Sequence, residues 1–64
     1  MIRLKEILEK RHLTQVWLAD QVGVTVVSVN NWCQNKSEPS LKTLASIAKV
    51  LRIKISDLII EENN

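Results

Sequence analysis

The stretch TQVWLADQVGVTVVSVNNWCQNK, residues 14–36, decides how this chain folds. Three apolar side chains early in it recur at the spacing of one helix face, about 100° per residue: Leu18, Ala19 and Val22. Gly23 follows that run, at a point where helices commonly end in a left-handed residue that costs glycine least. The spacing therefore predicts a helix over about residues 14–22 that ends in a tight turn.

A second helix is expected over about residues 26–34, directly after the turn. Residues 24–29 are β-branched at five of six positions, and propensity alone would make them a strand. Val29, Trp32 and Cys33, however, recur at helical spacing. Because the spacing on both sides of the turn fits two helices, we predict a helix-turn-helix pair.

The whole stretch resembles the phage-repressor/Cro-like helix-turn-helix family. The resemblance rests on positions that stand in register along the chain: Thr14-Gln15, Leu18-Ala19, Gly23-Val24-Thr25, Val29, Asn31, Trp32, Lys36 and Pro39-Ser40-Leu41. It extends over about residues 2–60. It implies an all-α fold, a compact five-helix lambda-repressor-like DNA-binding domain, and we expect residues 1–64 to form that single domain.

Apolar spacing outside the pair predicts three further helices, at about residues 2–11, 41–51 and 57–61. The core face expected for the middle one carries five side chains: Leu41, Leu44, Ala45, Ala48 and Leu51. Ser56 is expected to cap the last helix. Three residues stand where relatives favour glycine: His12, Asn35 and Arg52.

The composition is that of a globular protein, with 45% hydrophobic and 25% charged residues. The formal charge of +2 permits nucleic-acid binding without arguing for it. One cysteine excludes an internal disulfide, and no Cys/His cluster has metal-ligand spacing. No apolar run reaches the roughly 18 residues of a membrane span, and no signal-peptide pattern occurs. We therefore expect a cytoplasmic protein with no metal, no cofactor and no membrane contact.

The outward face of the second helix in the pair is the expected reader of base edges. Projection at about 100° per residue turns Val27 and Asn31 directly away from the core. Three flanking residues complete the expected base-reading set: Val26, Ser28 and Asn30. Asparagine can bond adenine at N6 and N7, and valine methyls can pack on the thymine methyl group. No Arg or Lys lies on this face to bind guanine, so we expect an operator rich in A·T pairs.

Two sites at the ends of the pair are expected to contact DNA phosphates. Thr14 and Gln15 stand at the amino end of the first helix, where free N–H groups and the helix dipole favour an anion. Thr25 stands at the corresponding place on the second helix. The resemblance implies that Gln15 hydrogen-bonds a phosphate, and that Asn35 and Lys36 form a second phosphate-contacting loop. Such contacts position a protein on DNA without identifying the sequence.

Trp17 and two isoleucines near the carboxyl end are the expected partner-contacting residues. Projection puts Trp17 on the outside of its helix, where an exposed indole would mark an interface. The alternative is that the indole folds over a neighbouring helix. Ile59 and Ile60 cannot both be buried by so short a helix, and relatives often dimerise through this region. A homodimer would place two reading helices roughly 34 Å apart on a palindromic site.

Cys33 faces the core in the same projection. Many relatives carry a glutamate here, paired with an arginine at the position of Leu8, and apolar residues can replace such an ion pair without loss of stability. We therefore predict that Leu8 and Cys33 touch. A redox-sensing role would need an exposed thiol with a low pKa, which a buried position does not provide.

The expected function is sequence-specific binding of double-stranded DNA by a small transcriptional regulator, most simply a repressor that occludes a promoter. The alternative is an antitoxin or controller whose main role is to bind a partner protein, through Trp17, Val16 and the two isoleucines. An enzyme is not expected, because the chain offers no acid–base or nucleophile–base pair and hence no catalytic residues. With no second domain, no small-molecule effector is expected either.

Overall fold

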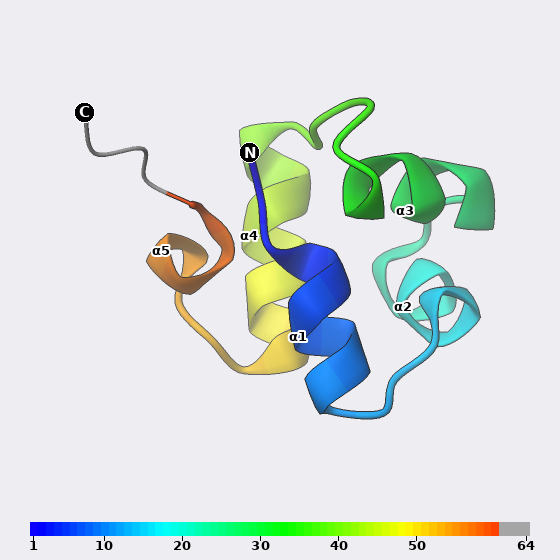
Figure 1. The fold of residues 1–64 in the computed structure, drawn as a ribbon, viewed down its shortest axis with the longest axis horizontal. Coiled ribbons are helices and arrows are strands. Elements are labelled where there is room, and N and C mark those ends of the chain that lie inside the picture. Colours follow the sequence, from blue (N-terminus) through cyan, green and yellow to red (C-terminus); the bar gives the residue numbers. More distant parts are fainter. Residues whose placement is uncertain (61–64) are drawn as a thin grey trace.

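Five helices, arranged around one apolar core, form the part of the chain that the computed structural model describes, residues 1–60 (Figure 1). In chain order they are α1 (Leu4–Lys10), α2 (Gln15–Val22), α3 (Val26–Cys33), α4 (Leu41–Leu51) and α5 (Ile55–Leu58). α2 packs on both α3 and α4, α4 packs on α5, and α1 packs on α3. The all-α five-helix fold expected from the sequence is confirmed.

Every helix contributes to the core. The side chains buried most completely come from all five: Leu4, Leu18, Val29, Ile47, Leu51 and Leu58. Burial of one such side chain contributes about 1.5–3 kcal/mol, whereas a domain of this size is only marginally stable. Each helix is therefore held mainly by the face that it turns inward, because helices this short are not stable alone.

α3 is a helix despite its β-branched sequence. Thr25 caps it: the Thr25 hydroxyl oxygen accepts a hydrogen bond from the Ser28 N–H at 3.1 Å. Three side chains on one side of the helix are buried: Val29, Trp32 and Cys33. The cap and the buried face together outweigh the local strand propensity, which depends on context more than helix propensity does.

The turn between α2 and α3 is made by the chain's single glycine. Gly23 has a φ of 79°, in the left-handed region. The N–H groups of Gly23 and Val24 both donate to the Ala19 carbonyl oxygen, at 2.9 and 3.0 Å. A Cβ atom at Gly23 would meet no atom within 4 Å. Glycine is therefore required here for its backbone conformation and not for space.

The buried face of α4 differs from the expected one. Leu41 is 72% exposed and Ala45 is exposed, so both assignments to the core were wrong. Ile47, which was not assigned to the core, is fully buried. The inward stripe follows the i, i+3, i+4, i+7 pattern of an amphipathic helix: Leu44, Ile47, Ala48 and Leu51. Leu41 is the first residue of the helix, beside the Ser40 cap, and falls outside that stripe.

The two ends of the described chain pair with each other instead of extending α1 and α5. Ile2 and Ile59 form an antiparallel bridge, with the Arg3 N–H donating to the Leu58 carbonyl at 2.9 Å and the Ile60 N–H donating to the Met1 carbonyl at 3.0 Å. The expectation of helix over residues 2–11 was therefore wrong at its start. Helix propensity cannot report a pairing between residues so far apart in the sequence.

α5 also begins earlier than expected. Its N-cap is Lys54, whose N–H donates to Asp57 Oδ2 at 3.1 Å. Ser56 lies inside the helix, so its assignment as a cap was wrong. The helix ends at Leu58 and Ile59 is extended, so the expected continuation through residues 59 and 60 was also wrong. Residue 61 lies outside the described residues.

Within residues 1–60, three residues other than glycine adopt the left-handed conformation. They are the ones that stand where relatives favour glycine: His12 (φ 56°), Asn35 (φ 57°) and Arg52 (φ 57°). A side chain at such a φ brings Cβ too close to the following carbonyl oxygen, at a cost of roughly 1–2 kcal/mol. The described part of the chain therefore carries backbone strain at three turns.

Replacing Arg52 by glycine should relieve one of these strains. Arg52 is the C-cap residue of α4, with φ 57° and ψ 47°. We expect Arg52→Gly to be more stable than Arg52→Ala by about 1 kcal/mol, because both lose the same side chain and only glycine adopts this conformation freely. In thermal denaturation that difference is a rise in Tm of about 4–8 °C for a domain of this size. Equal Tm values for the two variants would show that the turn is not strained.

Candidate nucleic-acid interface

The outward face of α3 lies at one end of the molecule, far from α5 (Figure 1). Val27 is 70% exposed and Val26 is 41% exposed on this face. Three other residues of the predicted base-reading set are half-buried: Ser28, Asn30 and Asn31. The predicted set therefore divides into two exposed apolar side chains and three polar ones that the fold partly covers.

Asn30 is tied to the first turn of α2. Its Nδ2 donates a hydrogen bond to Gln15 Oε1 at 3.2 Å. The sequence placed Asn30 among base readers and Gln15 among phosphate contacts, and it did not predict that the two touch. The bond uses the Gln15 oxygen and leaves its Nε2 group, a donor, available to a phosphate. Gln15 and Asn30 thus form a polar bridge that fixes the two helices relative to each other.

The two threonines of the predicted phosphate set cap α2 and α3. The Thr14 hydroxyl oxygen accepts a hydrogen bond from the Trp17 N–H at 3.0 Å. Thr25 does the same for Ser28 and also donates to Ser28 Oγ at 3.0 Å. These bonds place the two threonines at the helix starts as the sequence predicted. A cap leaves other N–H groups of the first turn without an intrahelical partner.

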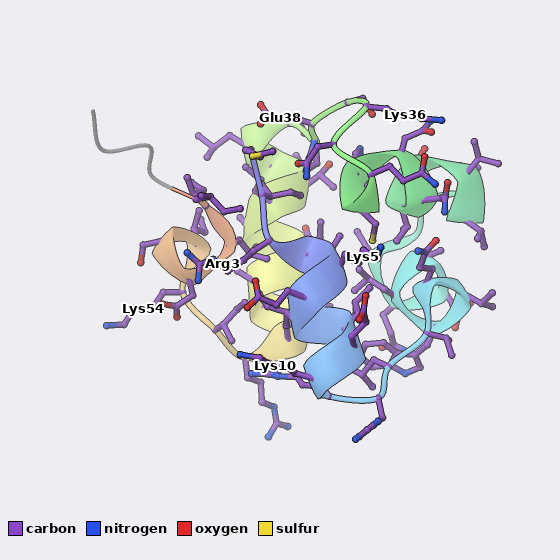
Figure 2. The ribbon with its side chains drawn as sticks, viewed as in Figure 1. Arg3, Lys5, Lys10, Lys36, Glu38 and Lys54 are labelled. Atoms are coloured by element: carbon purple, nitrogen blue, oxygen red, sulfur yellow. The ribbon has the colours of Figure 1, made fainter. Side chains whose placement is uncertain are left out.

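The loop after α3 carries an exposed cation, beyond the end of the helix opposite to Val26 and Val27. Lys36 is exposed, and its backbone N–H donates to the Asn31 carbonyl at 2.9 Å. Figure 2 shows Lys36 on the loop at the end of the molecule that holds α3. The segment from Gln21 to Ser37 contains no acidic residue. The face therefore combines methyl groups, amides and one lysine without a neighbouring carboxylate from that segment.

Trp17 does not point outward as the projection predicted. It is half-buried and packs against the core. α2 packs on both α3 and α4, so more of its circumference is covered than that of a helix with one neighbour, and a projection of α2 by itself contains neither neighbour. Val16, at 63% exposure, is the large apolar side chain that α2 leaves open to solvent.

The two isoleucines assigned to partner contact lie in the segment that pairs with the amino-terminal residues. Ile59 is 38% exposed and Ile60 is half-buried. Both lie beyond the last residue of α5, Leu58. The expectation that the segment leaves apolar surface exposed is met by Ile59.

A groove of about 360 Å³ lies away from α3, where α1 faces α5 and the link before it. It is lined by Arg3, Glu6, Ile7, Lys10, Arg11, Ile53, Ser56 and Asp57. Several of its charged groups already have partners: Glu6 Oε1 lies 3.6 Å from Lys10 Nζ, and the Arg11 guanidinium donates to the Leu51 carbonyl.

Within residues 1–60 no group of His, Cys, Asp and Glu side chains is arranged to hold a metal ion. None of the described helices is both long and apolar enough to cross a membrane.

Residues 4–58 match the family model described as helix-turn-helix. The chain belongs to the phage-repressor/Cro-type helix-turn-helix family of DNA-binding transcriptional regulators. It is 40% identical over 58 residues to an uncharacterized HTH-type transcriptional regulator from Archaeoglobus fulgidus, covering 91% of this chain and 82% of that protein. It is also similar to the crystal structure of a presumed DNA-binding protein from Bacteroides fragilis, with a TM-score of 0.86, 36% identity, and coverage of 91% and 94% of the two chains. The family resemblance seen in the sequence is confirmed.

Cys33 lies on the inner side of α3 in this helix-turn-helix unit. It is 6% exposed, so the buried interpretation is confirmed. Burial raises the pKa of its thiol above the ordinary value of 9.0, Lys5 opposes that shift, and Glu9 adds to it. Leu8 is buried in the same core, and α1 packs on α3; direct contact between Leu8 and Cys33 stays a prediction.

The raised pKa predicts how stability depends on pH. In the folded state the thiol holds its proton to a higher pH than in the unfolded state, so its contribution is complete below the ordinary pKa and is lost as pH rises through the folded pKa. We expect the free energy of unfolding to fall more steeply above pH 9.0 in the wild type than in Cys33→Ala. Urea denaturation at a series of pH values measures both slopes, and parallel slopes would contradict the prediction.

Proposed function

We propose that this protein is a sequence-specific transcriptional regulator, most simply a repressor, that reads the major groove of DNA with α3. The observation that carries the proposal is the exposure of Val26 and Val27 at the start of α3, at one end of the molecule, with the exposed Lys36 on the loop that follows the other end of the same helix. The major groove admits an α-helix, and its base edges differ in donors, acceptors and methyl groups. A DNA-binding role would place the protein in the compartment that contains the DNA.

The side chains on α3 favour A·T pairs. The two valines can pack on thymine methyl groups, and Asn31 can bond adenine at N6 and N7. Asn30 contributes to base reading indirectly, because its bond to Gln15 holds α3 at a fixed place on α2. Ser28 is already bonded to Thr25, and it therefore ranks below Asn31 as a base reader.

Phosphate contacts would come from both sides of α3. On one side are the starts of the two helices, with Gln15 Nε2 and the threonine caps. On the other side is the loop that carries Asn35 and Lys36. Contacts on both flanks of a reading helix fix its register along the groove before any base is read.

A homodimer on a palindromic operator is the simplest assembly for this function. One reading helix covers only a short half-site, and two related by a twofold axis would lie roughly 34 Å apart. The partly exposed Ile59, with Ile60, is the apolar surface that we assign to the contact. A main role in binding a different protein through Trp17 has less support, because that indole packs against the core.

The first test is binding of a labelled duplex taken from upstream of the protein's own gene, by fluorescence anisotropy at two salt concentrations with scrambled competitor. We expect Lys36→Ala to weaken binding to all sequences and to reduce the slope of log K against log salt by about 1. Lys54→Ala is the matched control, because it removes the same charge at the α5 end of the molecule (Figure 2). Equal effects of the two variants would argue against a phosphate contact at Lys36.

The second test is selection of binding sites from a random duplex library. We expect A·T pairs at the central positions of each half-site, and Asn31→Ala should relax one position by about 1–3 kcal/mol of discrimination. A consensus rich in guanine at those positions would contradict the assignment of Val26, Val27 and Asn31 to base reading.

A further inference from the structure

The loop between α3 and α4 is fixed to the amino-terminal segment through one side chain. Asn35 Oδ1 accepts a hydrogen bond from the Ile2 N–H at 3.3 Å. The two residues are far apart in the sequence, and Ile2 is 4% exposed. The next residue along the loop is Lys36, the proposed phosphate contact.

The segment around Ile2 is also paired with residues 58–60. Met1 and Arg3, the neighbours of Ile2, make the backbone bonds to the segment that contains Ile59. The Ile2 N–H is not used in that pairing, and Asn35 supplies its partner. The Met1 amino group also lies 2.5 Å from Glu38 Oε1, so two contacts join the amino-terminal segment to the same loop, on which Figure 2 labels Lys36 and Glu38.

Backbone bonds carry this connection to Lys36. The Asn35 N–H donates to the Trp32 carbonyl at 3.1 Å, and the Lys36 N–H donates to the Asn31 carbonyl at 2.9 Å. Both bonds close the end of α3, and they require the left-handed φ of 57° at Asn35. The direction of Lys36 relative to the reading helix therefore depends on the conformation of Asn35.

At position 35, asparagine supplies a hydrogen-bond acceptor that glycine lacks. Glycine would adopt the same φ without strain, but it would leave the N–H of the buried Ile2 without the Oδ1 acceptor. The contrast with the other left-handed residues is informative: within residues 1–60, the side chains of His12 and Arg52 make no hydrogen bond. At Asn35 the strained backbone is accompanied by a bond that only this side chain supplies.

We propose that Asn35 is a positioning residue that sets Lys36 against a DNA phosphate by joining the α3–α4 loop to the Ile2 segment. The proposal rests on the proposed function and deepens it, because it gives Asn35 an indirect role in place of the direct phosphate contact that the family resemblance implies. A loop that is ordered before DNA arrives loses less conformational freedom on binding. The segment around Ile2 would then influence affinity without touching DNA.

The variant that tests this is Asn35→Gly, which keeps the left-handed backbone and removes the acceptor. His12→Gly is the matched control, since it also places glycine at a left-handed position, but outside the loop. Without DNA, amide hydrogen exchange should become at least about tenfold faster at Ile2 and Lys36 in Asn35→Gly, and should be unchanged there in His12→Gly. Unchanged exchange at both amides in Asn35→Gly would overturn the proposal.

A double-mutant cycle with Lys36→Ala separates an indirect role from a direct contact. Asn35→Gly should weaken duplex binding by about three- to tenfold for every sequence, and it should have almost no further effect in the Lys36→Ala background. Additive losses would show that Asn35 contacts DNA by itself and would overturn the proposal. Thermal denaturation of each variant verifies that the fold is intact.

Failure of the proposed function gives a different result. If the wild-type chain binds no duplex even at low salt, the regulator role fails and the phosphate-positioning role fails with it. If the wild type binds duplex but Asn35→Gly binds equally well, the regulator role stands and only the positioning role is overturned.

Discussion

The left-handed turn at Gly23 fixes the angle between α2 and α3, and the arrangement of the site depends on it. Two N–H groups meet at the Ala19 carbonyl, so α2 ends and α3 begins within a few residues. The Gln15–Asn30 bond joins the other parts of the same two helices. With α2 also packed on α4, α3 can bury Val29 and still present Val27 to solvent. The exposed face of α3, which we propose reads DNA, is thus a consequence of one turn and one packed helix.

The parts of the fold that the sequence predicted are those encoded by local spacing. The helix-turn-helix pair, its caps and the position of Gly23 all follow from residues within one or two turns of each other. The parts that it missed depend on distant segments. Trp17 packs against the core in a helix with two neighbours, α3 and α4, and the pattern of α2 alone contains no sign of those neighbours. The pairing of Ile2 with Ile59 and the link from Asn35 to Ile2 likewise leave no periodic signal in either segment.

The candidate site shows the same division. The exposure of Val26 and Val27 agrees with the projection, since a helix with one buried face must expose the opposite one. Asn31, which the projection turned directly away from the core, is half-buried. The polar residues were harder to assign, because an amide can bond to DNA, to solvent or to another side chain. Asn30 and Asn35 both bond to other parts of the protein. Two of the amides expected to meet DNA therefore already help to hold α3 and the loop after it in place.

The pairing of residues 1–3 with residues 58–60 also determines how the domain would respond to mechanical force. The bond between Ile60 and Met1 lies at the outer end of the pair, and the bond between Arg3 and Leu58 lies nearer the helices. A pull that separates Met1 from Ile60 would peel these bonds apart one after the other, which takes less force than shearing them together. The first part to detach under tension would then be the segment around Ile2, together with its hydrogen bond to Asn35, while the helix-turn-helix unit stays folded. A tether that pulls on both ends would in this way loosen the loop that we propose to contact DNA, without unfolding the domain.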